Sequence, residues 1–324
     1  MESLFERILS VQDVEKELLW LVEENGGHAE NAETDTTRKI LIAQTLVVVC
    51  DMSQKNQVAI INVGANTRHY KGFGKIKSPI FYDGTFEFIP VPTGKLVKGE
   101  EHIEKIKDWP RYKELKSFYG KESLAKFLPS RRWLDLRMHN DPQFDIPTYG
   151  DYLGNPRASK LRNLKKGDYL FFLAHLWRWM SDGIYDERGD FFLISFFEIS
   201  DWIELDNPNE KELTHYRKNP HVLAWYKLRS DSKASQKMDF RNHRIFKGTR
   251  NSKRFQKAVP FNREIADKVL RDVQGRKLKW HGRTALSTIG SYTRTVKFVK
   301  GPNDDESDAL KRIQILWEYV KRYA

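Results

Sequence analysis

Near its beginning, in residues 2–25, the chain repeats hydrophobic positions with the period of a helix. Leucine, isoleucine, phenylalanine and valine recur at intervals of three and four in residues 2–25, and Gly26-Gly27 follows. This spacing predicts an amphipathic helix, because glycine after the last periodic residue is a common helix stop. We therefore expect an N-terminal helical arm over residues 1–51 and a separate domain over residues 52–324.

The beginning of the expected domain is typical of β-structure. Val58–Gly64 is an apolar run that ends in glycine, which predicts a buried strand followed by a turn. Residues 78–94 predict two short strands around Asp83-Gly84, a dipeptide that readily takes the positive φ of a hairpin turn. Pro90 and Pro92 cannot donate to a β-ladder, so the pairing should end there.

Two strongly apolar runs separated by a polar turn occupy residues 164–204 and are typical of two paired strands. A leucine, a basic pair, Gly-Asp, an aromatic run and a second apolar strand ending in glutamate follow one another here. This order resembles the PUA-like and EVE-like barrels that bind RNA or modified DNA bases. The resemblance implies a PUA-like centre at about residues 130–205. A plain buried hairpin would explain the same pattern.

Helical periodicity returns in three other places. It predicts two helices within residues 100–128, one helix at residues 262–273 and a terminal helix at residues 305–323. Together with the predicted strands, these segments indicate an α+β protein. Its expected parts are a mixed β core with a PUA-like barrel, an N-terminal helical arm and a C-terminal helix.

Positive charge is concentrated in one part of the chain. The protein has 56 Lys and Arg residues against 44 Asp and Glu residues, a formal net charge of +12. Residues 211–300 hold 24 of the cations and 6 of the anions, a net charge of +18, so the other 234 residues carry −6. A basic region of this kind favours a polyanionic partner, above all nucleic acid. The alternative is a solvated basic face that only aids solubility.

The densest part of this basic region, RNHRIFKGTRNSKRFQK, mixes cations with hydroxyl, amide and aromatic side chains. Cations and hydroxyl groups bind phosphates, and bases stack on aromatic rings. A second set of such residues follows Gly290. We therefore predict phosphate or nucleic-acid contacts from Lys247, Ser252, Arg254, Tyr292 and Arg294.

Cysteine usage and hydropathy indicate a cytoplasmic protein. The single cysteine, Cys50, cannot form an internal disulfide and lacks the neighbours of a zinc site or redox pair. Continuous apolar stretches such as Leu46–Cys50 are far too short to span a bilayer. We expect a soluble protein of the reducing cytoplasm, with no membrane partner.

The loop-rich stretch of residues 131–162 holds the densest set of chemistry-bearing side chains. It contains a general acid or base, carboxylates to orient it and cations for phosphate, and loops on a rigid scaffold commonly carry function. We predict catalytic roles for His139, Asp141, Tyr149 and Asp151, and phosphate contacts from Arg157 and Lys160. The alternative is that both aspartates form turns whose side chains bond to the backbone.

A second phosphate-binding candidate lies at the end of the first predicted strand, where Asn66, Thr67 and Arg68 follow a glycine. Strand ends often bind phosphates in α/β proteins, although a capped glycine turn explains the same residues. The sequence has no P-loop, dinucleotide fingerprint, HExxH or zinc-deaminase pattern. It therefore assigns no metal ligand and identifies no cofactor.

Three blocks of the sequence together resemble one family. They are VAIINVGANTRH with the following KSPIFYDGTFEFIPVP, then HNDPQFDIPTYGD, and then RASKLRNLKKGDYLFFLAHLW, within residues 57–204. In these blocks the chain is similar to the nucleotide modification associated proteins of the third type, found in prokaryotes and viruses. The resemblance implies a link to systems that build or handle modified nucleobases, without a defined reaction. The N-terminal arm and the basic C-terminal section depart from it.

Three hypotheses of function follow from the sequence. The first is a nucleotide or nucleic-acid base modification protein, with the residues around His139 near the chemistry and Arg254 and Arg294 holding phosphate. The second is a non-catalytic reader of modified DNA or RNA bases. The third, a modification-dependent nuclease, needs a carboxylate-bound metal that the sequence does not locate. The sequence does not distinguish DNA, RNA and free nucleotide as the partner.

Overall fold

A computed structural model gives the fold of the expected domain. It describes residues 56–64, 76–92, 109–117, 124–129, 131–181, 184–186, 189–229, 240–272, 274–278 and 296–323. These residues belong to one compact unit, residues 56–324. The predicted N-terminal arm, residues 1–51, lies outside the described residues.

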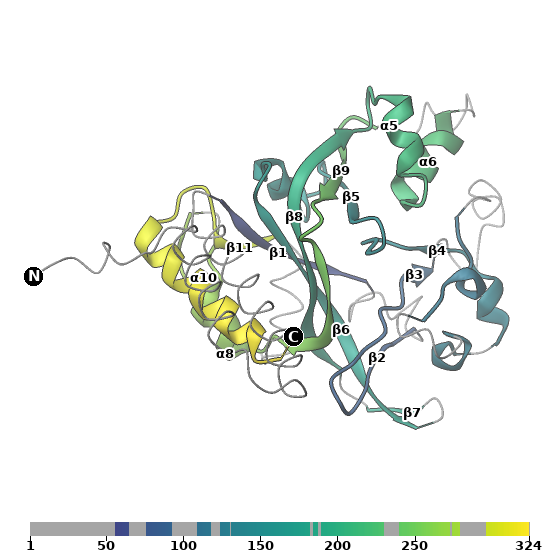
Figure 1. Ribbon diagram of the computed structural model, residues 1–324, viewed down its shortest axis with the longest axis horizontal. Coiled ribbons are helices and arrows are strands. Elements are labelled where there is room, and N and C mark those ends of the chain that lie inside the picture. Colours follow the sequence, from purple (N-terminus) through teal and green to yellow (C-terminus); the bar gives the residue numbers. More distant parts are fainter. Residues whose placement is uncertain are drawn as a thin grey trace, which may run out of the picture. The chain divides into compact units, whose positions relative to one another are not determined.

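The described chain is a mixed α+β fold (Figure 1). Its strands are β1 (Val58–Val63), β2 (Ser78–Ile80), β3 (Val91–Pro92), β4 (Met138–His139), β5 (Thr148–Tyr152), β6 (Tyr169–Ser181), β7 (Ile184–Tyr185), β8 (Asp190–Glu204), β9 (His243–Gly248), β10 (Lys253–Pro260) and β11 (Lys297–Lys300). Its helices are α5 (Glu210–His215), α6 (Pro220–Arg229), α8 (Arg263–Val269) and α10 (Glu306–Lys321), with 3₁₀ turns η1 (Tyr112–Glu114), η2 (Leu124–Phe127), η3 (Arg131–Asp135) and η4 (Ser159–Asn163).

A nine-stranded sheet organises this fold. Its main path runs β11-β1-β6-β8-β9-β5 and curls into a half barrel, while β2, β7 and β10 pair beside it (Figure 1). β1 and β2 pair with β6 in parallel, and the other pairs of the sheet are antiparallel. The mixed β core predicted from the sequence is therefore confirmed. β3 and β4 form a separate pair.

The two long strands cause the curl of the sheet. β6 pairs with β1 from Tyr169 onward and with β2 from Leu176 onward, and β8 pairs first with β10 and then with β9. The β6–β8 register shifts between Phe172 and Leu173, and the β8–β9 register shifts after Ile199. Such irregularities bend a strand and increase its twist. Each of these two strands thus pairs with different neighbours along its length, and the two parts of the sheet point in different directions.

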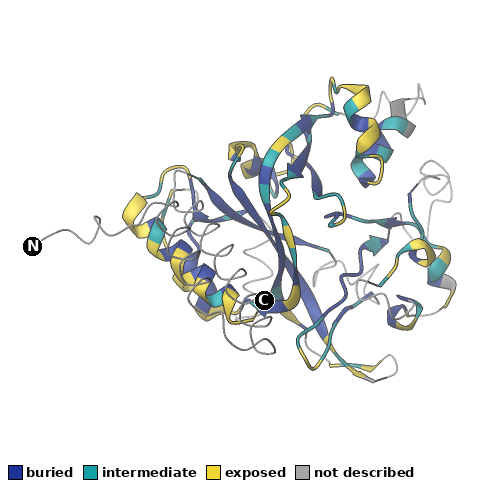
Figure 2. Ribbon diagram, viewed as in Figure 1, coloured by how far each residue is buried: buried dark blue, intermediate teal, exposed yellow. Residues whose placement is uncertain are grey.

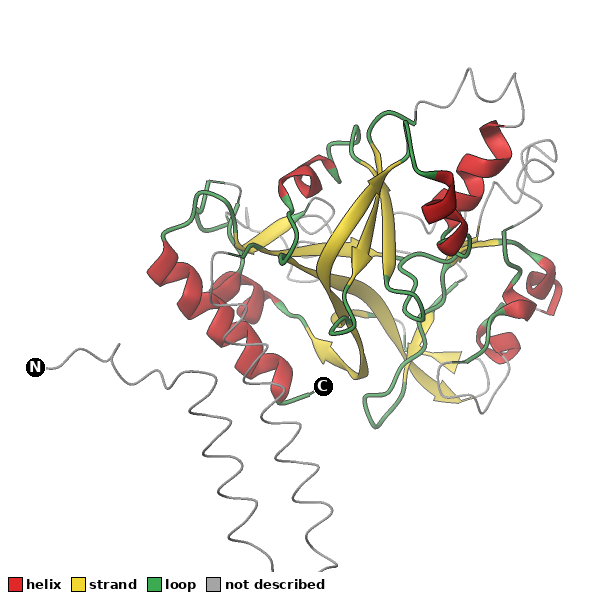
Figure 3. Cartoon of the chain, turned by 45° about the horizontal axis from the view of Figure 1, so that its top comes forward, coloured by secondary structure: helices red, strands yellow, loops and turns green. Residues whose placement is uncertain are grey.

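Both faces of the sheet are packed. On one face Phe172 of β6 meets Phe197 of β8 with ring centroids 4.7 Å apart, and Tyr149 of β5 packs on Phe172 at 5.2 Å. On the other face Trp317 of α10 meets Phe196 at 5.9 Å. Figure 2 shows β6 and β8 buried along most of their length, and Figure 3 shows helices flanking the strands. The sheet is therefore a rigid frame for the loops at its edges.

Several local predictions are confirmed. Gly64 and Gly84 have φ angles of +73° and +86°, so glycine ends β1 and closes the hairpin turn after Asp83. The two apolar runs form β6 and β8, and Asp305 caps α10 with its side chain accepting the Asp308 N–H. The predicted helix at residues 262–273 is shorter, because α8 ends at Val269.

The prediction of two helices within residues 100–128 is wrong for the part that the structure describes. That part contains only the 3₁₀ turns η1 and η2. Pro110 prevents a continuous helix, and the buried Tyr112 donates its hydroxyl to the Pro90 carbonyl at 2.5 Å. Packing of this tyrosine thus overrides the helical period of the charged residues. Among the described residues, no helix has the length and apolar character needed to cross a bilayer.

A buried arginine attaches α10 to the end of β11. Arg312 donates its Nε–H to the Val299 carbonyl at 2.9 Å, and its guanidinium pairs with Asp304 and Asp308. The side chains of Arg312 and Asp304 are only 3% and 2% exposed. Removing one member of a buried ion pair is costly, because the other charge stays buried without compensation.

We expect Arg312→Met to lower the free energy of unfolding by about 3–5 kcal/mol, since the Asp304 carboxylate then loses its cation. Urea denaturation followed by circular dichroism measures this change. Lys311→Met, at an exposed neighbouring position of α10, is the matched control and should stay within about 0.5 kcal/mol of the wild type. Equal unfolding midpoints for the two variants would contradict the structural role of Arg312.

Candidate functional site

Strand β5 at the end of the main sheet path carries half of the candidate site. It pairs with β9, and Asp151 lies opposite Arg244. Successive residues of a strand point to opposite faces. Tyr149 and Asp151 therefore share one face, whereas Gly150 and Tyr152 share the other. Tyr149 and Asp151 are both buried, so these polar groups depend on partners inside the protein.

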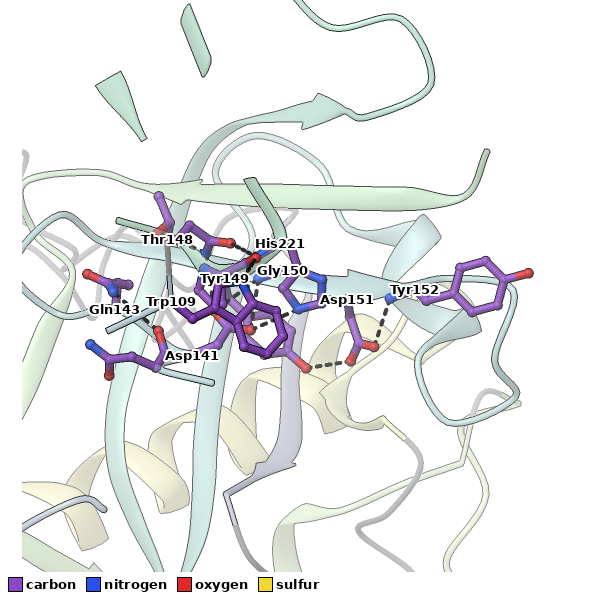
Figure 4. A network of polar contacts seen from close by, with 12 residues as sticks. Trp109, Asp141, Gln143, Thr148, Tyr149, Gly150, Asp151, Tyr152 and His221 are labelled. Carbon is purple, nitrogen blue, oxygen red and sulfur yellow. Dashed lines mark hydrogen bonds and ion pairs between the residues drawn. The ribbon is translucent and has the colours of Figure 1, made fainter. Parts of the chain in front are cut away.

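The Asp151 carboxylate is the centre of a polar network (Figure 4). The Tyr149 hydroxyl and Arg157 Nη2 both donate to Asp151 Oδ2, each at 2.5 Å. Arg157 Nη1 also donates to the carbonyl of Asn62 at 3.2 Å, at the end of β1. Burial raises the pKa of the Tyr149 phenol well above its usual value, so the phenol is a hydrogen-bond donor at neutral pH. The Arg157 side chain is still 37% exposed.

A second group joins two imidazoles and a carboxylate. His139 ends β4, Asp141 follows two residues later, and His221 lies in the first turn of α6. One ligand atom of each side chain lies within 4.8 Å of the others, and His221 Nε2 is 3.6 Å from Asp141 Oδ2. The two imidazole rings meet edge to face with centroids 4.7 Å apart. Three side chains of two types that proteins use as metal ligands, imidazole and carboxylate, thus converge here.

Asp141 is held from two sides. The Gly150 N–H donates to its carboxylate oxygens at 3.2 and 3.1 Å, and Asn219 Nδ2 donates to Oδ1 at 3.3 Å. The Asn219 Oδ1 accepts the His221 N–H at 2.9 Å. Asn219 is therefore the N-cap of α6, and Pro220 takes the first helical position that proline favours. The cap places His221 beside Asp141.

The backbone of β5 approaches His221 so closely that only glycine fits at position 150. A Cβ atom on Gly150 would lie 2.4 Å from His221 Cδ2, far inside van der Waals contact. On another side, the Trp109 ring meets the His139 ring edge to face at 5.5 Å and donates its Nε1–H to the Pro220 carbonyl at 3.0 Å. The two imidazoles are therefore confined by neighbours.

Burial governs the electrostatics of this group. It lowers the pKa of His139 to about 4, with a further contribution from His221, and it lowers the pKa of His221 to about 4. Burial raises the pKa of Asp141 to about 7. At neutral pH both imidazoles are consequently neutral and have a free lone pair, while the carboxyl group lies near its titration point. Such a set can exchange protons or ligate a cation.

The structure brings most of the predicted catalytic stretch together. His139, Asp141, Tyr149, Asp151 and Arg157 lie in one continuous cluster, in which electrostatic effects of Asp151 and Arg157 reach His139. Lys160 is exposed on η4. The predicted roles of these residues stay predictions.

The residues predicted to bind phosphate are dispersed. Lys247 Nζ is 3.0 Å from Asp201 and 2.5 Å from Glu212. Ser252 Oγ accepts the backbone N–H of Glu198. Asn66, Thr67, Arg68, Tyr292 and Arg294 lie outside the described residues.

Arg254 is largely enclosed. Its side chain is 9% exposed, donates to the Phe86 carbonyl and lies 3.6 Å from Glu87. Its guanidinium also lies over the rings of Phe86 and Phe144. The contacts of Lys247 and Arg254 are thus with this protein's own acidic and aromatic groups.

Sequence reasoning missed His221 and Asn219. The dipeptide Asn219-Pro220 is a readable helix-start signal, but it gives no indication of what lies opposite the helix. About eighty residues separate this cap from Asp141 along the chain. Only the fold brings the two segments into contact.

The fold and site define a class: a mixed α+β protein with a His, Asp, Tyr and Arg cluster, built around buried carboxylates, at the edge of a curled sheet. The family model of nucleotide modification associated domain 3 matches residues 57–288. The chain belongs to this family, which associates it with nucleotide modification systems. The match includes most of the basic section, which the sequence analysis treated as a departure from the family. No curated protein and no solved structure matched the chain.

We expect Tyr149→Phe to lower the free energy of unfolding by about 1.5 kcal/mol, because Asp151 loses a donor that no water replaces in a buried position. Denaturant unfolding measures the loss. Tyr152→Phe, at a half-exposed position of the same strand, is the control and should change the stability by less than about 0.5 kcal/mol. A silent Tyr149→Phe would show that the hydroxyl does not stabilise the cluster.

Proposed function

We propose that this protein modifies a nucleotide or a nucleic-acid base, and that its reaction centre is the cluster around His139, Asp141, Tyr149 and Asp151, extended by His221. One observation carries the proposal. Neutral imidazoles and a carboxyl group with a pKa of about 7 converge in a member of a family associated with nucleotide modification. A general acid or base works best when its pKa lies near the working pH.

The neighbours of the cluster suit a nucleotide. Arg157 is partly exposed and already carries a carboxylate partner, so it supplies a positioned guanidinium for a phosphate or an electron-rich base edge. Tyr152 is half-exposed and lies against His243 with ring centroids 4.8 Å apart. Such rings offer a stacking platform for a base. We propose that base and phosphate are held on either side of Asp151.

The backbone of a polynucleotide would meet exposed cations near the cluster and along β10. Lys160, Arg250, Lys253 and Lys257 are exposed, whereas Lys247 and Arg254 already contact carboxylates. We therefore propose that the exposed cations make the first phosphate contacts. A role for Lys247 or Arg254 in phosphate binding would require exchange of these internal partners.

The second candidate function is a reader of modified bases. The curl of the sheet and the aromatic side chains that β6 and β8 carry on one face support it, because PUA-like domains, which the sequence of this region resembles, bind RNA or modified bases. Under this proposal residues 130–205 would form a PUA-like centre. It differs from the first in predicting binding without turnover.

Binding and chemistry are separable in one experiment. Purified protein is mixed with unmodified and base-modified DNA and RNA at two salt concentrations, and the nucleosides are then analysed by mass spectrometry. Salt-dependent binding with altered nucleosides supports the modification proposal. Binding with unchanged nucleosides favours the reader. If the protein binds no nucleic acid at low salt, both the modification and the recognition of nucleic acid are rejected, and free nucleotides are then tested as substrates.

We expect His139→Ala to lower the modification rate by about 10²–10⁴-fold, because it removes a side chain of the reaction centre that lies beside the proposed acid or base Asp141, while nucleic-acid affinity changes little. The rate is measured by nucleoside mass spectrometry. The control His215→Ala removes an exposed imidazole on α5 and should leave the rate unchanged. A normal rate in a folded His139→Ala protein would remove this residue from the chemistry.

We expect the double variant Lys253→Ala, Lys257→Ala to weaken binding equally for all nucleic-acid sequences. The slope of log affinity against log salt concentration should fall in magnitude by about 1–2, because binding with fewer phosphate contacts releases fewer counterions from the nucleic acid. Fluorescence anisotropy at several salt concentrations measures the slope. Lys311→Ala on α10 is a charge control at an exposed position. An unchanged slope would show that β10 does not face the polynucleotide.

A further inference from the structure

We propose that His139, Asp141 and His221 form a binding site for one divalent first-row transition-metal ion, of the group that includes Zn²⁺, Fe²⁺, Co²⁺ and Mn²⁺. Two imidazole nitrogens and one carboxylate oxygen are donors that suit these ions. Three protein ligands leave coordination positions open for water or a substrate oxygen, as in catalytic metal sites. The site shares its location with the proposed reaction centre and in that respect rests on the proposed function, but metal binding is measurable without a substrate.

The distances between donors fit a metal after a small adjustment. Ligand atoms at about 2.0–2.2 Å from one ion lie about 3–3.5 Å from each other. His221 Nε2 and Asp141 Oδ2 are already 3.6 Å apart, and all three donors lie within 4.8 Å. Closing the longest separation takes a movement of about 1 Å. The two imidazoles are packed against Gly150 and Trp109 on one side but are not fully enclosed, so small rotations about their side-chain bonds can provide it.

Asp141 is fixed in the way that a metal-binding carboxylate requires. Metal ligands are oriented by hydrogen bonds from a surrounding layer of groups. Here the Gly150 N–H and the Asn219 amide hold the carboxylate, and Asn219 simultaneously holds the backbone of His221. One residue therefore orients two of the three ligands, which makes Asn219 a positioning residue for the site.

The charge of Asp141 provides a second, independent argument. Its side chain is 2% exposed, and among the described residues its ion-pair partner is the His221 imidazole alone. The Gly150 N–H and the Asn219 amide that hold this carboxylate carry no net charge, and a buried carboxylate without a cation is unfavourable. A divalent cation between the three groups would supply the missing positive charge. Asp151, in contrast, already has Arg157.

Gly150 makes room for this arrangement. Any Cβ at this position would overlap the His221 ring, with 2.4 Å to Cδ2 and 2.7 Å to Cγ. The missing side chain lets the β5 backbone bind Asp141 while the ring lies directly against it. The variant Gly150→Ala keeps all three ligands but should displace His221, so it tests the geometry and not the chemical identity of the donors.

The test is a metal titration of the full chain. After treatment with a chelator and its removal, Co²⁺ and then Zn²⁺ are added, and binding is followed by visible absorption of bound Co²⁺, by calorimetry and by metal analysis after gel filtration. We expect one equivalent per chain and a rise of the melting temperature with metal. Mn²⁺ and Fe²⁺, the latter without oxygen, identify the preferred ion. The proposal is overturned if the protein binds none of the four ions, Co²⁺, Zn²⁺, Mn²⁺ and Fe²⁺, at micromolar metal concentrations.

Variants localise the ion. We expect Asn219→Ala and Gly150→Ala to weaken binding by about 10–100-fold and to alter the Co²⁺ spectrum, as for loss of ligand orientation. Asp141→Asn and His221→Gln should weaken it at least as much, and the exposed His215→Ala should bind as the wild type does. Circular dichroism selects the variants that are folded. Unchanged affinity in folded Asp141→Asn, His221→Gln and Gly150→Ala proteins places the ion elsewhere and overturns the site.

The metal site and the proposed function fail in different ways. One bound equivalent that is lost in the ligand variants, together with unchanged nucleosides, supports the metal site and rejects the modification proposal. Altered nucleosides from protein that binds no metal in the titration support the modification proposal and reject the metal site.

Discussion

The burial of the Asp141 carboxylate is the constraint on which the rest of the site depends. A buried charge is tolerated only when donors or cations surround it. Here the donors come from the β5 backbone and from the cap of α6. The Asp141 loop and β5, which are neighbours in sequence, and the distant cap of α6 must therefore dock correctly before this group is stable. The curled sheet supplies the frame for β5, and the cap of α6 adds the last partner.

The sequence predicted what depends on neighbouring residues. Glycine at a positive φ ends β1, two strongly apolar runs form β6 and β8, and helical periodicity marks α10, because each signal acts within a few residues. The stretch with His139 and Asp151 was identified from its composition alone. The alternative, that Asp151 forms a turn, is wrong, because this residue lies in strand β5. Its carboxylate accepts the N–H of Tyr152 at 2.8 Å while it also binds Tyr149 and Arg157.

What the sequence could not provide is pairing across long separations. His221 was missed because only the sheet and the helix cap bring it to Asp141. Charge shows the same limit. The net charge of +18 in residues 211–300 includes Arg244 and Lys300, but these cations pair with Glu204 and Glu306, which both lie outside that region of the sequence. Counting charges gives their sum, whereas the field at the surface depends on where the partners lie. The helices predicted in residues 100–128 failed for a related reason, since tertiary packing of one tyrosine outweighed local periodicity.

The cap of α6 has a mechanical consequence. Asn219 holds Asp141 with its amide and the first turn of the helix with its carbonyl oxygen, so α6 cannot swing away from β5 while the cluster stays intact. Occupancy of the cluster and docking of the helix are then a single equilibrium. A ligand bound to the cluster would therefore also stabilise the docked position of α6. Slower hydrogen exchange of the backbone amides along this helix would report that the cluster is occupied.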